Sequence, residues 1–84
     1  MYWDVKKVKL INHLKLYVEF EDGLHGVIEF RPSYLTGVFQ LLKDPDTFFK
    51  VGIKNGVVTW ECGLDLAPDR SYHEIKNHGK WVLK

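Results

Sequence analysis

The feature that most constrains the fold is an alternation of apolar and polar side chains over the first thirty residues. From Val8 to Phe30 the apolar positions recur in steps of two, with breaks only at two short polar segments. Successive side chains of a β-strand point to opposite faces, so a period of two predicts strands with one buried face. The first third of the chain is therefore expected to form a three-stranded antiparallel meander.

The turns of this meander follow from the pairings that keep the apolar side chains on one face. Between the second and third strands, a loop over residues 21–23 with a left-handed glycine sets Leu16 opposite Ile28. A two-residue loop there would mix the two faces of the sheet. The same test places the first loop at residues 11–13, with Val8 opposite Leu16.

The next segment, residues 31–49, is expected to be helical. Pro32 removes a backbone donor and ends the strand, and Ser33 can cap a short helix. The apolar positions of that helix are Leu35, Val38, Phe39 and Leu42. A second helical turn should follow, with Asp44 as its cap and Pro45 as its first residue.

The dipeptide Asn55-Gly56 is the strongest local turn signal in the chain. It favours a two-residue type I′ turn, which pairs Ile53 with Val58 and Val51 with Trp60. All four side chains then share one face of the hairpin.

The C-terminal part contains one helix signal and one strand signal. Ser71 and Glu74 have the spacing of a capping box, which predicts a short helix that ends near Gly79. Residues 80–84 alternate again, with Trp81 and Leu83 on one side, and form either a sixth strand or a docked tail.

Together these elements predict a single α+β domain over residues 1–84. We expect an antiparallel sheet of about five strands (meander, short helix, hairpin) with one or two short helices on one face. The 84 residues, of which 45% are hydrophobic and 14% aromatic, are enough for one thin core.

Charge and cysteine content bound the function. A net charge of +1 lacks the strong positive field that favours non-specific binding to nucleic acid or anionic membranes. Cys62 is the single cysteine, so an internal disulfide is excluded. No apolar run approaches the roughly 18 residues of a membrane span, and the charged beginning lacks a signal-peptide core. We therefore expect a cytoplasmic protein that does not associate with membranes.

Several segments resemble a small, mostly bacterial family known as domain of unknown function 2442. The resemblance covers about residues 5–72. Its most specific part is the segment that starts at Trp60 and ends at Tyr72. Further matching segments are residues 18–23, Gly37-Val38-Phe39 with Leu42, and Asp44-Pro45 with Phe48; within the specific segment the matching residues are Trp60, Gly63, Asp65, Leu66, Ala67, Pro68, Asp69 and Tyr72. The family favours proline where Glu61 stands and leucine where Ser71 stands.

The resemblance implies an α+β fold and no established catalytic residue. It also implies gene settings beside other small proteins, in arrangements that look like toxin and antitoxin pairs. Some longer relatives carry a helix-turn-helix after this domain, but only 12 residues follow Tyr72. Nucleic-acid binding through such a motif is therefore not expected.

The motif residues Trp60, Gly63, Asp65, Pro68, Asp69 and Tyr72 are the candidate interaction patch. Trp60 and Tyr72 are expected to anchor the core. Asp69 follows proline and is expected to accept backbone N–H bonds at a helix start, while Asp65 fixes its own loop in the same way. Asp69→Asn should then be nearly neutral, because an amide oxygen caps as a carboxylate does.

Reactive chemistry is the weaker interpretation of the same segment. Glu61, Asp65, Asp69 and His73 would have to converge to form a metal or general-acid site. A zinc site built on Cys62 with His73 or His78 lacks a further soft ligand. We expect Cys62 to be buried or half-buried, and we expect no metal and no cofactor.

Four lysines of the first strands, Lys6, Lys7, Lys9 and Lys15, form the remaining candidate surface. With Trp3 and Tyr17 between them they could bind nucleic acid. Lysines on an edge strand also prevent sheets from pairing with one another, which needs fewer assumptions.

The leading hypothesis is a non-catalytic interaction or regulatory module, antitoxin-like, whose partner is another small protein such as the product of an adjacent gene. A nucleic-acid-binding accessory domain and a small hydrolase or metal enzyme using Asp65, Asp69 and His73 are the alternatives. Homo-oligomerisation stays open.

Overall fold

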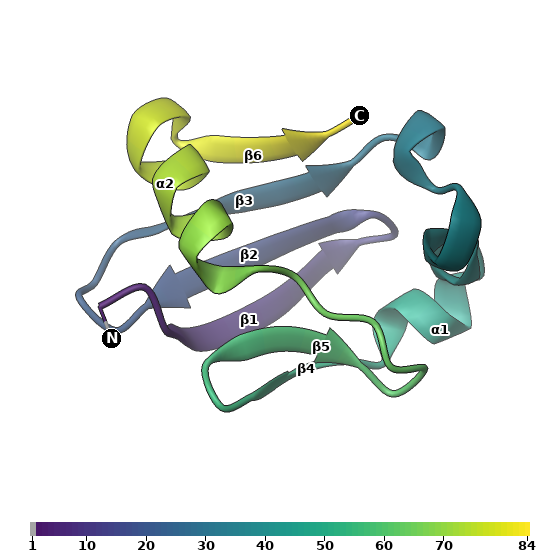
Figure 1. The fold of residues 1–84 in the computed structure, drawn as a ribbon, viewed down its shortest axis with the longest axis horizontal. Coiled ribbons are helices and arrows are strands. Elements are labelled where there is room, and N and C mark those ends of the chain that lie inside the picture. The colour runs from purple at the N-terminus through teal and green to yellow at the C-terminus, as the bar shows by residue number, and fades with distance from the viewer. Residues whose placement is uncertain (1) are drawn as a thin grey trace.

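The centre of the fold is a mixed four-stranded β-sheet (Figure 1). The computed structural model describes residues 2–84. The sheet contains β1 (Val5–Asn12), β2 (Lys15–Phe20), β3 (His25–Phe30) and β6 (Lys80–Leu83), in the order β1-β2-β3-β6. The meander of β1, β2 and β3 is antiparallel, as predicted, whereas β6 is parallel to β3. The expectation of one antiparallel sheet of about five strands therefore needs correction in strand number and direction.

The parallel pairing follows from the helix that precedes β6. After α2 (Pro68–His78), Gly79 adopts a left-handed conformation with φ 79° and turns the chain directly into β6. Trp81 then lies beside Ile28, and Leu83 lies beside Phe30. The C-terminal residues, for which the sequence left a strand or a tail open, form a strand.

The β2–β3 hairpin has the predicted register and turn. Leu16 pairs with Ile28 and Val18 pairs with Gly26. Gly23 has φ 93°, as the left-handed position of a three-residue loop requires.

The β1–β2 hairpin differs from the prediction. β1 continues to Asn12, so Val8 pairs with Val18 and not with Leu16. The longer hairpin gains cross-strand pairs but introduces a bulge near its end and a left-handed Leu14 with φ 70°. His13 in the turn contributes to this choice, because its Nε2 lies 3.0 Å from the carbonyl oxygen of Leu42.

The predicted helix over residues 35–42 is replaced by two 3₁₀ segments. They are η1 (Pro32–Tyr34) and η2 (Gly37–Lys43), and neither has a side-chain cap. Gly37 has φ 57°, which breaks the helical path before η2. The next prediction is confirmed: α1 (Pro45–Phe49) begins at a proline, and Asp44 accepts a bond from the backbone N–H of Thr47.

The Asn55-Gly56 hairpin forms as predicted. β4 (Val51–Lys54) and β5 (Val57–Trp60) pair Val51 with Trp60 and Ile53 with Val58. The two turn residues have φ 53° and 78°. This hairpin is a separate two-stranded sheet that lies beside β1, and the N–H of Val5 bonds the carbonyl of Gly56.

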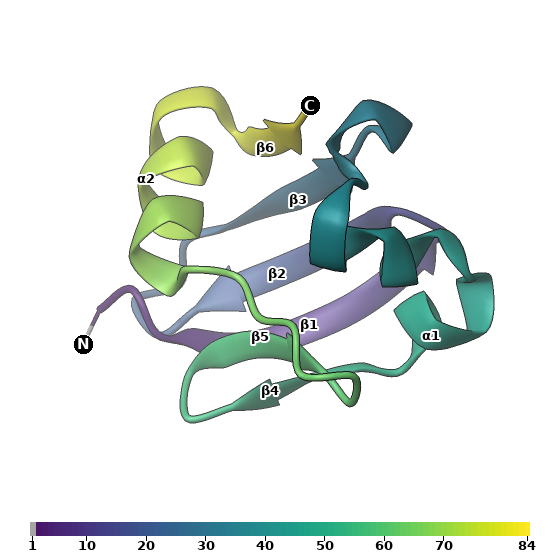
Figure 2. The same cartoon turned by 45° about the vertical axis from the view of Figure 1, so that its right-hand side comes forward.

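One face of the four-stranded sheet is covered and the other is open. The covered face packs against α2, α1, the 3₁₀ segments and the β4–β5 hairpin in one core. Figures 1 and 2 show α2 at one end of this layer, and η2 and α1 at the other end beside the β1–β2 turn. The sheet contributes to this core Val5, Leu16, Val18, Phe20, Ile28, Phe30, Trp81 and Leu83.

Candidate functional site

The segment between Trp60 and Tyr72 is an irregular connection that follows β5 and then enters α2. The N–H of Trp60 bonds the carbonyl of Leu64, and the N–H of Leu66 bonds the carbonyl of Val58. Asp65 forms an isolated antiparallel bridge with Thr59. Backbone groups therefore fix this loop, and among the described residues the Asp65 carboxylate takes no hydrogen bond in it.

Helix α2 starts four residues earlier than the capping box predicted, since its N-cap is Ala67 and not Ser71. Pro68 is its first residue and Ala67 its N-cap, without a side-chain cap. Ser71 lies inside the helix, where its hydroxyl donates to the carbonyl of Ala67 at 2.9 Å. Asp69 is exposed in the first turn, and the expected capping bonds from it are not formed in the described chain. The helix begins at Pro68, and not at a capping side chain, because the fixed φ of proline suits the first helical position.

Trp60 and Tyr72 anchor the core, as expected, with 2% and 6% of their surface exposed. The indole Nε1 of Trp60 donates to the carbonyl of Phe48 at 3.0 Å, which ties the hairpin to α1. The ring of Tyr72 packs edge-on against Phe20, with 5.2 Å between centroids.

The hydroxyl of Tyr72 donates a short hydrogen bond of 2.5 Å to Asp22 Oδ2. Asp22 Oδ1 accepts a second bond from the N–H of Leu24, so this carboxylate holds its own turn and α2 together. The bond from Tyr72 is the main cause that lowers the pKa of Asp22. The same bond, with burial, raises the pKa of Tyr72 to about 12. Sequence reasoning missed this pair, although both residues lie in segments that carry the family resemblance.

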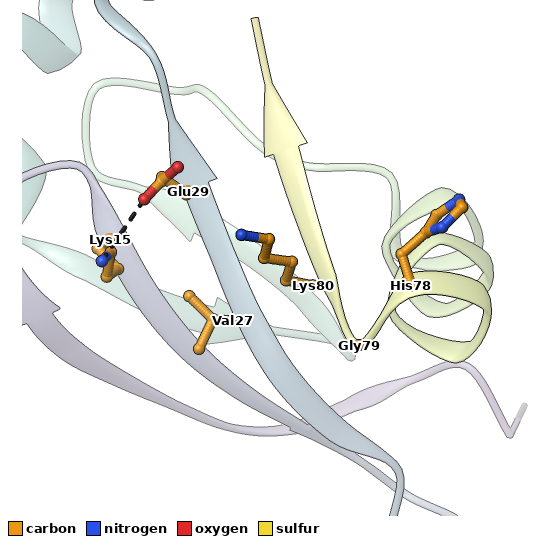
Figure 3. Close-up of a pocket in the computed structure, with 6 residues that line it drawn as sticks. All are labelled: Lys15, Val27, Glu29, His78, Gly79 and Lys80. Atoms are coloured by element: carbon orange, nitrogen blue, oxygen red, sulfur yellow. Dashed lines mark ion pairs between the residues drawn. The ribbon is translucent and has the colours of Figure 1, made fainter.

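The open face of the sheet has a hollow of about 380 Å³, shown in Figure 3. Two of the charged groups that line it pair with each other, since Lys15 Nζ lies 3.5 Å from Glu29, and Arg31 lies 3.1 Å from the same carboxylate. Lys80 points onto this face, whereas His78 points away from the other labelled side chains.

A second hollow, of about 480 Å³, lies on the β4–β5 hairpin. We call it the hairpin groove. Gly52 lies on β4, two positions after Lys50 at the end of α1 and two before Lys54, and no atom lies within 4 Å of the place that a Cβ on this glycine would occupy. Residues that line the hairpin groove include Lys50, Gly52, Ile53, Lys54, Thr59 and Glu61.

Exposed apolar side chains gather on the elements next to this groove. Of the seven large apolar side chains exposed among residues 2–84, six belong to the end of β1, to η2, to α1 and to β4. His13 joins these elements, since its ring lies 6.3 Å from Phe49 and its Nε2 lies near the Leu42 carbonyl. We call this surface the apolar end; it consists of Leu10, Ile11, Val38, Leu41, Phe49 and Ile53, with exposed fractions from 36% to 66%.

Comparison with protein families places the described motif in a known group. The model of the family described as "Protein of unknown function (DUF2442)" matches residues 5–77, which is most of the chain. The chain belongs to this family. Comparisons with curated proteins and with solved structures gave no match.

The DUF2442 motif does not form a common cleft. Its aromatic residues point into the core, whereas Asp65 and Asp69 are exposed. Within residues 2–84, no three acidic, histidine or cysteine side chains lie close enough together to hold a metal ion. Cys62 was expected to be buried or half-buried, but it is exposed, because it lies in the turn at which Gly63 adopts φ 97°.

The lysines of the first strands are partly neutralised within the sheet of this DUF2442 member. Lys6 lies 3.8 Å from Glu19, and Lys15 pairs with Glu29. Tyr17 donates a hydrogen bond to Glu19. The pKa of Tyr17 is raised, mainly by burial and to a smaller extent by the Glu19 carboxylate. Trp3 packs against the core and does not lie between the lysines. The surface formed by these lysines is thus less basic than the sequence suggests.

In the part of the chain that is described, no helix has the length and apolar character needed to cross a bilayer.

Proposed function

We propose that this DUF2442 member is a non-catalytic protein-interaction module. The observation that carries the proposal is the apolar end, where six apolar side chains remain exposed on adjoining elements. Exposed apolar side chains that gather on one surface are typical of protein contact sites. Covering apolar surface is favourable by about 25 cal/mol per Å², so a partner that fits this end gains affinity from it.

The mechanism is binding without chemistry. Leu41 and Phe49 project from η2 and α1, which are fixed to the core by Leu42 and Phe48. His13 links these two segments to the β1–β2 turn. A partner therefore meets side chains on a supported surface, which limits the entropy lost on binding.

The partner that we propose is another small protein encoded beside this chain, in an antitoxin-like or regulatory arrangement. The gene settings implied by the family resemblance support this choice. The apolar end supplies the surface through which such a partner would be held.

Co-expression with the products of neighbouring genes tests the proposal. We expect a complex with a dissociation constant in the micromolar range or tighter, measured by sedimentation velocity or interferometry. The double change Leu41→Asp with Phe49→Asp should weaken that complex by about thirtyfold or more, since the residues that dominate an interface each cost more than about 1 kcal/mol when they are removed. Both side chains are about half exposed, so the melting temperature should change little.

Val27→Glu is the matched control. It also places a carboxylate at an apolar position, but on the open face of the sheet between lysines. Full affinity of the Leu41→Asp and Phe49→Asp protein, or the absence of a complex with every neighbouring product, would contradict the proposal.

A further inference from the structure

The hairpin groove combines two lysines, a glycine floor and one apolar wall. Gly52 and Lys54 share one face of β4, and Lys50, the residue just before that strand, lines the same groove. Thr59 stands opposite Gly52 on β5. From this arrangement, and resting on the proposed function, we propose that the groove binds an acidic, extended segment of a partner protein.

The charges distinguish this groove from the hollow on the open face of the sheet. There, Glu29 already pairs with Lys15 and with the neighbouring Arg31. Lys50 and Lys54 have no acidic partner among residues 2–84, although Glu61 lines the same groove. Two unpaired ammonium groups beside a hollow attract carboxylates, and complementary charge sets both the rate and the specificity of association.

The spacing of the lysines specifies the form of the segment. Lys50 and Lys54 line the groove four positions apart, and an extended peptide rises roughly 3.3 Å per residue, so side chains on one of its faces can reach both lysines. Two acidic side chains four residues apart can therefore meet Lys50 and Lys54. The residue midway between them lies over Gly52, where no atom stands within 4 Å of a Cβ position.

Other occupants fit the groove less well. Nucleic acid carries a phosphate at every unit, and one of these phosphates would face Glu61, whereas a peptide can leave that position uncharged. A second copy of this chain that docked here in a two-fold contact would bring the same lysines against Lys50 and Lys54. Ile53, which belongs to both the groove and the apolar end, is 36% exposed and suits an aliphatic side chain of a protein.

Selection from a display library of random peptides tests the inference with the purified chain as bait. We expect the enriched peptides to be rich in Asp and Glu at positions four apart, with an aliphatic residue between them. Binding of an enriched peptide, followed by fluorescence polarisation, should weaken about tenfold or more in a protein with Lys50→Glu and Lys54→Glu. Gly52→Val should also block binding, and its melting temperature should stay near that of the wild type because the floor is open.

The control pair Lys7→Glu and Lys80→Glu makes the same change in net charge outside the groove and should leave peptide affinity within about twofold. Three results would overturn the inference: enriched peptides without acidic residues, acidic peptides that bind the groove variants as well as the wild type, or no enrichment at all. Duplex binding or self-association that depends on Lys50 and Lys54 would also overturn it. None of these results decides the proposed function, which depends on the complex with a neighbouring gene product and on Leu41 and Phe49.

Discussion

At the scale of single residues, Tyr72 and Asp22 show what the motif of this family does in the folded chain. The two residues are 50 positions apart, and their hydrogen bond joins the turn before β3 to α2. Lys76 lies 5.9 Å above the ring of Tyr72, and Tyr2 packs on the same ring. The tyrosine thus completes the core with its ring and fixes a turn with its hydroxyl.

The pH dependence of stability should reveal this bond. The pKa of Asp22 is lowered below its ordinary value of 3.8, so its stabilising effect is full above that pH and is lost as the pH falls through the folded-state pKa. The pKa of Tyr72 is raised from 10.0 to about 12, so its contribution is full below pH 10.0 and is lost as the pH rises towards 12. Urea unfolding of the wild type and of Tyr72→Phe should show a stability difference that is constant near neutral pH and shrinks on both sides. A difference that is independent of pH would contradict this account.

Asp69 gives a second test at this scale. Its carboxylate caps nothing, but it lies in the first turn of α2, where negative charge interacts favourably with the helix dipole. Asp69→Ala and Asp69→Asn should therefore cost the same small amount, about 0.3 to 1 kcal/mol, in chemical denaturation at low salt. A neutral Asn variant beside a costly Ala variant would restore the capping role expected from the sequence.

The sequence predicts the place of a single residue well where the size and apolar character of its side chain decide whether it is buried. Trp60 and Tyr72 are the core residues that their size and setting indicated. Asp22 was recognised only as part of a turn, because no local pattern says which distant hydroxyl will reach it. Cys62 was misjudged, since its exposure depends on the direction of the turn at Gly63.

At the scale of elements, the packing of α2 on β3 depends on Gly26. A Cβ at this position would lie 2.6 Å from the carbonyl oxygen of Gly79 and 2.6 Å from Ile75 Cγ2. The close approach lets the C-terminal end of α2 sit directly on the sheet before the chain enters β6.

Two alanine substitutions test this close approach. Gly26→Ala should destabilise the domain by about 1 to 3 kcal/mol, because the backbone of Gly79 has to move away. Gly52→Ala is the matched control, since it also lies in a strand but has open space around it. It should be neutral or slightly stabilising in a urea titration. Similar losses in both variants would mean that strand conformation, and not the contact with α2, governs the effect.

Elements with one strong local signal were predicted well. Segments in which two local signals favour different structures were not. The Asn55-Gly56 hairpin formed as expected because two left-handed positions suit these residues better than almost any others. The helix over residues 35–42 did not form, since its apolar spacing could not overcome Gly37. Helix α2 likewise starts at Pro68 and not at the capping box, because the fixed φ of proline suits the first helical position.

At the scale of the whole molecule, β6 completes the sheet although it lies outside the residues that the family model matches. The match ends at residue 77, and β6 spans Lys80–Leu83. Trp81 and Leu83 are buried against the same core as the motif residues Trp60 and Tyr72. Sequence patterns identified the alternation in this segment but not its neighbour or direction, which follow from the path of α2.

Loss of the Trp81 side chain should therefore threaten the whole domain. We expect Trp81→Ala to cost about 3 to 5 kcal/mol, the usual range for a buried aromatic side chain. A small domain has only about 5 to 15 kcal/mol in total, so the transition should shift strongly in urea or on heating. Lys84→Ala, just beyond the strand, is the control and should be neutral. A near-native Trp81→Ala protein would show that β6 is dispensable.

The pairing of β3 with β6 also bears on the route by which the chain folds. Three hairpins join strands that are close in the sequence: β1 with β2, β2 with β3, and β4 with β5. Such hairpins close within microseconds. The contact of Val27 with Lys80 closes a far longer loop, whose entropic cost must be met before any contact is gained. We expect a transition state in which the meander is formed and β6 is still undocked, so changes in Trp81 should act mainly on the rate of unfolding.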